Sequence, residues 1–207
     1  MDAEPREALE LEIREACDDA RLREAATHAI KGYGPEILGY LAAMTRSESD
    51  AAEVFSTFCE DLWRGLPGFR WASSFRTWSY ALARHALSRY GRDPSRRPAR
   101  NLALSEADEV FELAERVRST TMVHLRTAVK NEFAVLREKL EPDDRTLLVL
   151  RVDRRMAWSE IARVMWEEDG EPDSDGLKRN AAALRKRFER AKERLRRLAK
   201  EANLLKS

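Results

Sequence analysis

The sequence predicts an all-α protein with two helical domains joined by a flexible linker, the second containing a helix-turn-helix. The chain has 207 residues with only 8 glycines and 7 prolines, too few for a typical β-rich fold. Ala, Leu, Glu and Arg are abundant, and they form helices readily. Apolar residues recur at helical spacing along most of the chain. The segment Asp93–Pro98, with two prolines and two arginines, gives the strongest linker signal and predicts the end of the first domain.

Charge is distributed unevenly along the chain. Charged residues make up 36% of the sequence, yet the net charge is only +1. Residues 1–24 hold nine acids and four arginines, whereas residues 84–100 hold six arginines and one acid, and residues 178–207 hold twelve basic and three acidic residues. Two separate basic segments predict two contacts with a polyanion. The alternative is that they are solvated helix faces.

Several kinds of chemistry have no signature in the sequence. Cys17 and Cys59 lack a metal-ligand spacing, so we expect small buried side chains in a reducing compartment. The three histidines are scattered, and no phosphate-binding loop, nucleophile elbow or paired catalytic carboxylates are found. No signal peptide or membrane-spanning apolar run is present. We therefore expect a cytoplasmic protein that is not an enzyme, does not insert into a membrane, and uses no cofactor or metal.

The first half of the chain divides into helices at its turn residues. Apolar spacing predicts a helix from Pro5 to about Lys31, and Gly32–Pro35 is expected to end it before a short second helix. The turn Ser47–Asp50 predicts a helix start, and Asp50–Leu66 has an apolar stripe with acidic residues beside it.

Aromatic and basic residues are concentrated in Phe69–Tyr80, which leads into a predicted helix over residues 73–90. Rings interleaved with cations can hold unstacked bases against a phosphate backbone. The alternative is that Phe75 and Trp78 face a helical core. Arg76, Tyr80 and Arg84 recur every four residues and are expected on another face.

The second half predicts a helix-turn-helix. Helices are expected over 105–118 and 123–140, and Pro142 opens another that continues to Val152. Trp158–Trp166 follows, with Ser159 as its candidate N-cap, and Ala181–Glu201 forms a long basic helix. Helix, tight turn and helix followed by a basic helix is the arrangement of a DNA-binding helix-turn-helix. A coiled-coil strand is the alternative for the last helix.

Two groups of motifs resemble bacterial extracytoplasmic-function (ECF) sigma factors. Their promoter-melting domain is resembled by the first group, which consists of Asp50–Phe55 leading to Trp63-Arg64, followed by Phe69–Tyr80. The second group resembles their second domain and consists of Leu140–Arg145, Trp158–Ala162 and Leu184–Leu195. Together the two groups extend over about residues 33–198. It implies an N-terminal extension over 1–31, a region-2-like domain over 32–92, a linker over 93–120 and a region-4-like domain over 121–207.

The resemblance also implies partners and site residues. The chain would bind the clamp helices of the RNA polymerase core and promoter DNA, and an anti-sigma factor is a possible further partner. The implied polymerase contacts are Asp50, Glu53 and Trp63. The implied minus-ten contacts are Arg70, Trp71, Ser73, Ser74, Arg76, Tyr80, Arg84 and Arg89. The implied minus-thirty-five contacts are Arg185, Lys186, Arg187, Arg190 and Lys192, with Arg185 and Arg187 expected to reach base edges.

The sequence departs from the family pattern at three places. Ser56-Thr57 stands where many members have Gln-Glu, and Trp71-Ala72-Ser73 replaces the usual Gly-Asp before Ser. The connection between Met165 and Leu184 is long, and its acidic part, Glu167–Asp175, is either a passive loop or a screen over the basic helix. Two other functions remain open at this point: a stand-alone helix-turn-helix regulator that binds duplex DNA as a dimer, and a helical scaffold.

Overall fold

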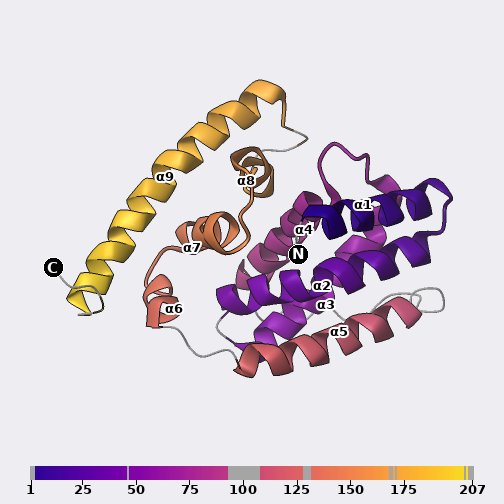
Figure 1. Ribbon diagram of the computed structural model, residues 1–207, viewed down its shortest axis with the longest axis horizontal. Helices are drawn as coiled ribbons and strands as arrows, with labels where there is room; N and C mark the ends of the chain where they lie inside the picture. The colour runs from indigo at the N-terminus through magenta and orange to yellow at the C-terminus, as the bar shows by residue number, and fades with distance from the viewer. Residues whose placement is uncertain are drawn as a thin grey trace. The chain divides into compact units, whose positions relative to one another are not determined.

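The computed structural model describes residues 3–45, 47–92, 108–127, 132–167, 170, 172–202 and 204. Helices and the turns between them account for these residues, and no strand occurs in these ranges (Figure 1). The all-α prediction is therefore confirmed. The chain divides into two compact units, Met1–Thr127 and Ala128–Ser207. None of the described helices is long and apolar enough to cross a membrane.

The first unit is built around one central helix. Its elements are α1 (Ala3–Asp18), α2 (Leu22–Thr45), α3 (Glu48–Gly65), the 3-10 turn η1 (Leu66–Gly68), α4 (Phe75–Arg92) and α5 (Asp108–Thr127). Helix α2 lies against α1, α3, α4 and α5. Its buried side chains include Ile30, Tyr33, Ile37, Tyr40 and Leu41, so α2 lies in the core of this unit.

Helix α2 continues through the segment that was expected to break it. Gly32-Tyr33-Gly34-Pro35 lies inside α2, so that prediction was wrong. The glycines serve packing, since a Cβ on Gly32 would collide with Leu9 and one on Gly34 would lie 3.0 Å from Val117 Cγ1. Pro35 is exposed, so water can solvate the carbonyl that loses its partner. The actual break precedes Leu22, where Ala20 has a left-handed φ of 56°.

The boundary between the units falls later than predicted. Residues 108–120 were assigned to the linker, but they form the first part of α5, which packs on α2 within the first unit. Val110, Leu113, Ala114 and Met122 are buried there. The apolar spacing predicted a helix here, but spacing alone cannot say which surface a helix covers. The linker signal at 93–98 lies outside the described residues.

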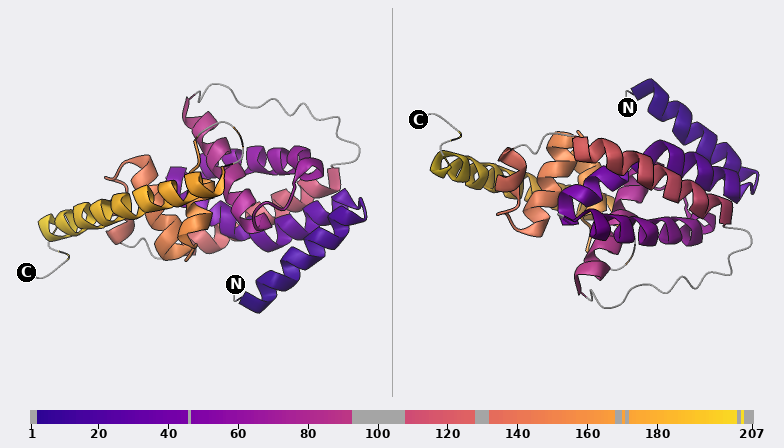
Figure 2. Two further views of the ribbon diagram at one scale, coloured as in Figure 1. Left: turned by 90° about the horizontal axis from the view of Figure 1, so that it is seen from above. Right: turned by 90° about the horizontal axis from the view of Figure 1, so that it is seen from below.

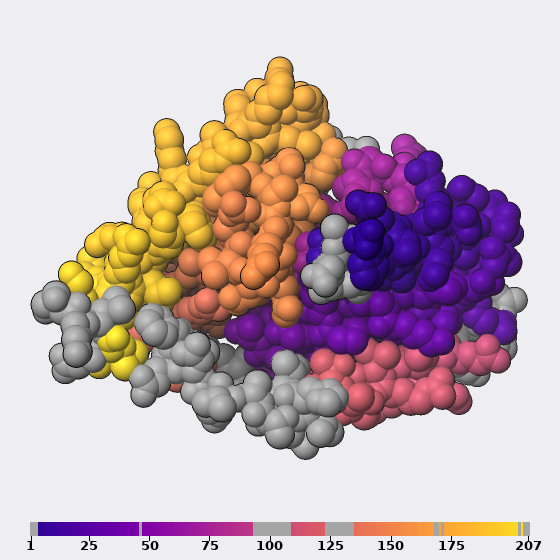
Figure 3. Space-filling model, in the orientation of Figure 1, coloured from indigo at the N-terminus to yellow at the C-terminus, as the bar shows by residue number. Residues whose placement is uncertain are grey.

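The second unit consists of short helices packed on one long helix. It contains α6 (Glu132–Arg137), α7 (Pro142–Leu148), the five-residue π-helix η2 (Val149–Asp153), α8 (Trp158–Val164) and α9 (Ser174–Glu201). Helix α9 contacts α6, α7 and α8. It runs unbroken in the left view of Figure 2 and forms an outer edge of this unit in Figure 3.

Two helix starts in the second unit differ from prediction. Helix α9 begins at Ser174, where Asp173 Oδ1 accepts from Gly176 N at 2.5 Å, so the acidic connection is shorter than expected and Asp173 is an N-cap. Helix α8 begins after Ala157, and Glu160 Oε2 accepts from Ala157 N at 2.6 Å. Ser159 is already inside α8, so its assignment as the N-cap was wrong.

Candidate nucleic-acid interface

The loop between η1 and α4 carries a cluster of partly exposed rings. Phe69 stacks on Trp78 with centroids 4.6 Å apart, and Trp71 lies 4.9 Å from Phe69. Phe75 is fully buried and meets Phe69 edge to face at 5.4 Å, so the core alternative is correct for Phe75. Phe69, Trp71 and Trp78 remain half-buried. Trp71 has a left-handed φ of 57°, which surrounding contacts must hold in place.

The first turn of α4 has its backbone donors satisfied by two side chains. Ser74 Oγ accepts from Thr77 N at 3.1 Å, so Ser74 is the N-cap of α4. Glu10 reaches across from α1, and its two carboxylate oxygens accept from Phe75 N at 2.7 Å and Arg76 N at 2.9 Å. Backbone donors at a helix start have no partner within the helix itself, so these side-chain acceptors fix where the loop ends and α4 begins.

Arg76 and Tyr80 lie in the interior of the first unit. The Arg76 side chain is 4% exposed and forms an ion pair with Glu36 of α2, which also accepts from Tyr80 Oη at 2.9 Å. Tyr80 is fully buried and meets Tyr40 edge to face. Their assignment to the DNA-contacting face is therefore corrected. Arg76 and Tyr80 do share a face of α4, as their four-residue spacing predicted, but this face packs on α2.

The remaining predicted minus-ten residues are more accessible. Arg70 and Ser74 are exposed, and Trp71, Ser73 and Arg84 are half-buried. Arg89 is also exposed, and its guanidinium forms an ion pair with Asp61 of α3. The structure thus gathers the loop residues, Arg70 to Ser74, beside the ring cluster, while Arg84 and Arg89 lie further along α4.

The predicted polymerase contacts do not form one cluster. Asp50 and Glu53 are three residues apart near the start of α3, and both are half-buried. Trp63 lies ten residues further on, about 15 Å along the helix axis. There it lines a hollow of about 580 Å³ together with the turn between α1 and α2. Asp50 and Glu53 share a face, and Trp63 marks a second position on α3.

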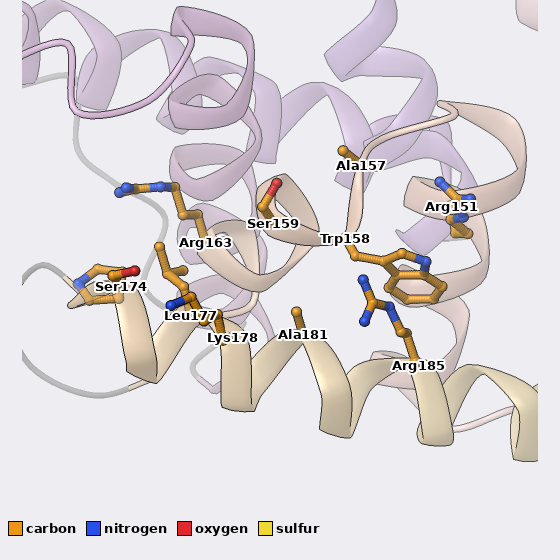
Figure 4. A pocket seen from close by; sticks show the side chains of 11 residues that line it. Arg151, Ala157, Trp158, Ser159, Arg163, Ser174, Leu177, Lys178, Ala181 and Arg185 are labelled. Atoms are coloured by element: carbon orange, nitrogen blue, oxygen red, sulfur yellow. The ribbon is translucent and has the colours of Figure 1, made fainter.

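A basic hollow lies between α8 and the first half of α9. It has a volume of about 830 Å³ and is lined by Arg151, Arg163, Lys178 and Arg185 among others. In Figure 4 the Arg185 side chain extends from α9 toward the ring of Trp158. The guanidinium carbons of Arg185 and Arg151 lie 5.7 Å and 5.1 Å from the centroid of that ring. The arrangement combines positive charge with an aromatic surface, which suits a polyanion.

Arg187 is occupied by contacts within the second unit. Its Nε donates to Asp144 Oδ1 at 2.5 Å, and its Nη1 donates to Asp143 Oδ2 at 3.3 Å. Partial burial alone would lower the pKa of Arg187, but the bonds to Asp144 and Asp143 raise it above its ordinary value. In this arrangement the guanidinium joins α9 to α7, so the expectation that Arg187 reaches a base edge is not supported.

The exposed residues of α9 begin earlier than the sequence suggested. Arg185, Lys186 and Arg190 are exposed as expected, and Lys192 is half-buried beside Glu189, with its Nζ 2.9 Å from Glu189 Oε2. The N-terminal half adds exposed residues that were not predicted: Lys178, Arg179, Ala182 and Ala183. Arg151, Trp158 and Arg163 were also missed as site residues. Extending the helical spacing back to the Asp173 N-cap would have found Lys178 and Arg179.

Comparison with known proteins gave a family match in the first unit and two relatives with a similar sequence. Residues 29–97 match the model of the family described as Sigma-70 region 2, a segment that holds most of α2, then α3, the loop and α4. The chain is 28% identical over 147 residues to RNA polymerase sigma factor YlaC of Bacillus subtilis, covering 69% of this chain and 80% of that protein. It is 27% identical over 136 residues to the RNA polymerase sigma-H factor of Pseudomonas aeruginosa, covering 64% and 70%.

Proposed function

We propose that this chain, which belongs to the ECF type of RNA polymerase sigma factors, starts transcription by holding two promoter elements with two separate surfaces. As an alternative sigma factor it is an initiation factor rather than a stand-alone regulator. Its partners are RNA polymerase core and promoter DNA. The observation that carries the proposal is the pair of cationic and aromatic surfaces, the loop before α4 and the hollow beside α9.

The loop surface is proposed to hold the opened minus-ten element. Arg70 supplies an exposed positive charge beside the half-buried rings of Phe69 and Trp71. Unstacking a base step costs on the order of a few kcal/mol. Stacking a base on an aromatic ring returns about 1–3 kcal/mol. A small number of such contacts can therefore hold a short opened segment by binding energy, and we propose that the chain acts in this way rather than as an enzyme.

The first half of α9 is proposed to enter the major groove at the minus-thirty-five element. Lys178, Arg179, Arg185 and Lys186 project from its exposed face. Ala182 and Ala183 are exposed between them, and these small side chains permit close approach and apolar contact with a thymine methyl group. Arg185 remains the first candidate for a guanine edge, since the guanidinium can bind O6 and N7 together.

Helix α3 is proposed to dock on the clamp helices of the polymerase largest subunit. Asp50 and Glu53 present negative charge at its start, and Trp63 adds a half-buried ring near its end. Acidic side chains steer association with a basic partner, and a ring at the rim of a hollow is a typical interface anchor. Helix α3 is also the candidate surface for an anti-sigma factor, which would then compete with polymerase core.

The direct test is run-off transcription with purified core polymerase and this chain on genomic fragments. We expect defined start sites that share two upstream sequence elements. The matched comparison is a chain carrying Arg70→Ala, which removes an exposed charge at the loop and leaves the ring cluster in place. The variant should bind core polymerase normally and open promoters more slowly. Failure of the wild-type holoenzyme to initiate on any fragment would overturn the proposal.

A further inference from the structure

The carboxylate of Glu10 in α1 accepts hydrogen bonds from two backbone N–H groups in the first turn of α4. One oxygen accepts from Phe75 N at 2.7 Å, and the other accepts from Arg76 N at 2.9 Å. The second oxygen also accepts from Tyr33 Oη at 2.7 Å. Burial is the larger cause that raises the pKa of Tyr33, and the bond to Glu10 adds to it, so the hydroxyl stays a donor at neutral pH.

A second residue of α1 contacts the same loop. Arg14 lies one helical turn after Glu10, and its guanidinium carbon is 5.3 Å from the centroid of the Trp71 ring. Residues four apart share a face of a helix, so Glu10 and Arg14 present one face of α1 to the loop. Trp71 is the loop residue with left-handed φ, a strained conformation that persists only where neighbouring contacts hold it.

We infer that α1 is a positioning element for the surface that receives the unstacked base, and that Glu10 is its principal positioning residue. The inference rests on the proposed function of the loop. Glu10 binds no DNA in this scheme. It fixes the start of α4, and with it the direction in which Phe69, Trp71 and Arg70 are presented. Helix α1 and Glu10 lie outside the segment 29–97 that matches the sigma-factor family model.

The chemistry of the contact explains why a carboxylate is needed. Glu10 accepts three hydrogen bonds, two of them from the positive end of α4, where a negative charge is favoured. A glutamine has one acceptor oxygen, and its amide nitrogen would face a backbone N–H or the Tyr33 hydroxyl as a second donor. The change Glu10→Gln therefore keeps the size of the side chain, removes its negative charge, and leaves at least one of the two α4 backbone donors without an acceptor.

The test measures promoter opening by holoenzyme reconstituted with core polymerase, using 2-aminopurine placed in the minus-ten element. Glu10→Gln should lower the rate of opening about tenfold, the size expected for losing a charge-assisted helix cap. Binding to core polymerase should stay within about twofold of wild type. Tyr33→Phe, which keeps the ring and removes one bond to Glu10, should give a smaller loss in the same direction. Glu7→Gln, at an exposed position one turn earlier on α1, should open promoters as wild type does.

The outcomes separate this inference from the proposed function. If the wild-type holoenzyme opens promoters and Glu10→Gln opens them equally fast with an unchanged preference for the captured base, the inference is wrong and the proposed function stands. If the wild type itself opens no promoter, the proposed function fails. A general loss of folding in Glu10→Gln would show as a lower melting temperature together with reduced core binding, and that result would also overturn a specific positioning role.

Discussion

Neutralising Glu36 tests whether Arg76 belongs to the interior or to the DNA surface. The Arg76 side chain is 4% exposed and that of Glu36 is 16% exposed. Arg76 Nε donates to Glu36 Oε1 at 3.0 Å, and Tyr80 Oη donates to the same oxygen. The change Glu36→Gln keeps the volume and removes the negative charge that faces this guanidinium.

The size of the effect follows from the burial. Removing one partner of a buried ion pair leaves an uncompensated charge and typically costs about 3–5 kcal/mol. For a unit of this size, a loss of about 3 kcal/mol corresponds to a fall in melting temperature of roughly 10 °C. Replacing both partners with apolar residues of similar volume, Glu36→Leu with Arg76→Met, should recover a large part of the loss, because no unpaired charge is then left inside.

The assay is thermal unfolding of the full chain, with promoter opening measured in parallel. We expect Glu36→Gln to melt well below wild type and the double variant to melt closer to it. Arg70→Ala, at an exposed loop position, should leave the melting temperature unchanged and slow opening. The reasoning would be refuted if Arg76→Met alone melted like wild type and still abolished opening, since Arg76 would then act on DNA directly.

Three further predictions concern the second unit and the cysteines. Arg187→Ala should lower the free energy of unfolding of the second unit by about 1 kcal/mol in urea and change the base preference at the minus-thirty-five element little. Arg185→Ala should instead cost about 1–3 kcal/mol of DNA binding at one base position in a competition assay. Arg179→Gln should weaken holoenzyme binding to all promoters alike and reduce the slope of log K against log salt by about 1. Burial, and then the neighbouring charge of Glu60, raises the pKa of the Cys59 thiol. We therefore expect a thiol reagent to label the half-buried Cys17 first and Cys59 only when the protein unfolds, with the labelling followed by mass spectrometry.

The sequence predicted the helices well where apolar spacing was regular and a turn residue stood at each end. It failed at Gly32–Pro35, because the same residues that end many helices also permit close packing, here against Leu9 and Val117. It also failed to assign residues 108–120 to the first unit, because the periodicity of α5 does not name the surface that the helix covers.

In the candidate site, too, features within one stretch of sequence could be predicted, whereas contacts between distant residues could not. The cluster of rings before α4 and the basic face of α9 are local features, and both could be predicted. Arg76 and Arg187 look like DNA contacts in the sequence, yet their partners, Glu36 and Asp144, lie 40 and 43 residues away. A basic side chain is predicted to be exposed unless an acidic partner is visible nearby in the sequence. An acid on a distant helix is not visible in this way, so the ion pairs of these two arginines could not be predicted.

The contacts of Glu10 show how a residue distant in the sequence can order the loop before α4. An irregular loop ordinarily loses conformational entropy when it binds, and that loss subtracts from affinity. Here the loop between η1 and α4 is bounded by the Ser74 cap, by Glu10 on the following backbone donors and by the Phe69–Trp78 stack. Much of its ordering is therefore complete before DNA arrives. A contact energy of about 1–3 kcal/mol per stacked base can then be applied to holding the strands apart rather than to ordering the loop. Loosening any of these three contacts should slow promoter opening more than it weakens binding to core polymerase.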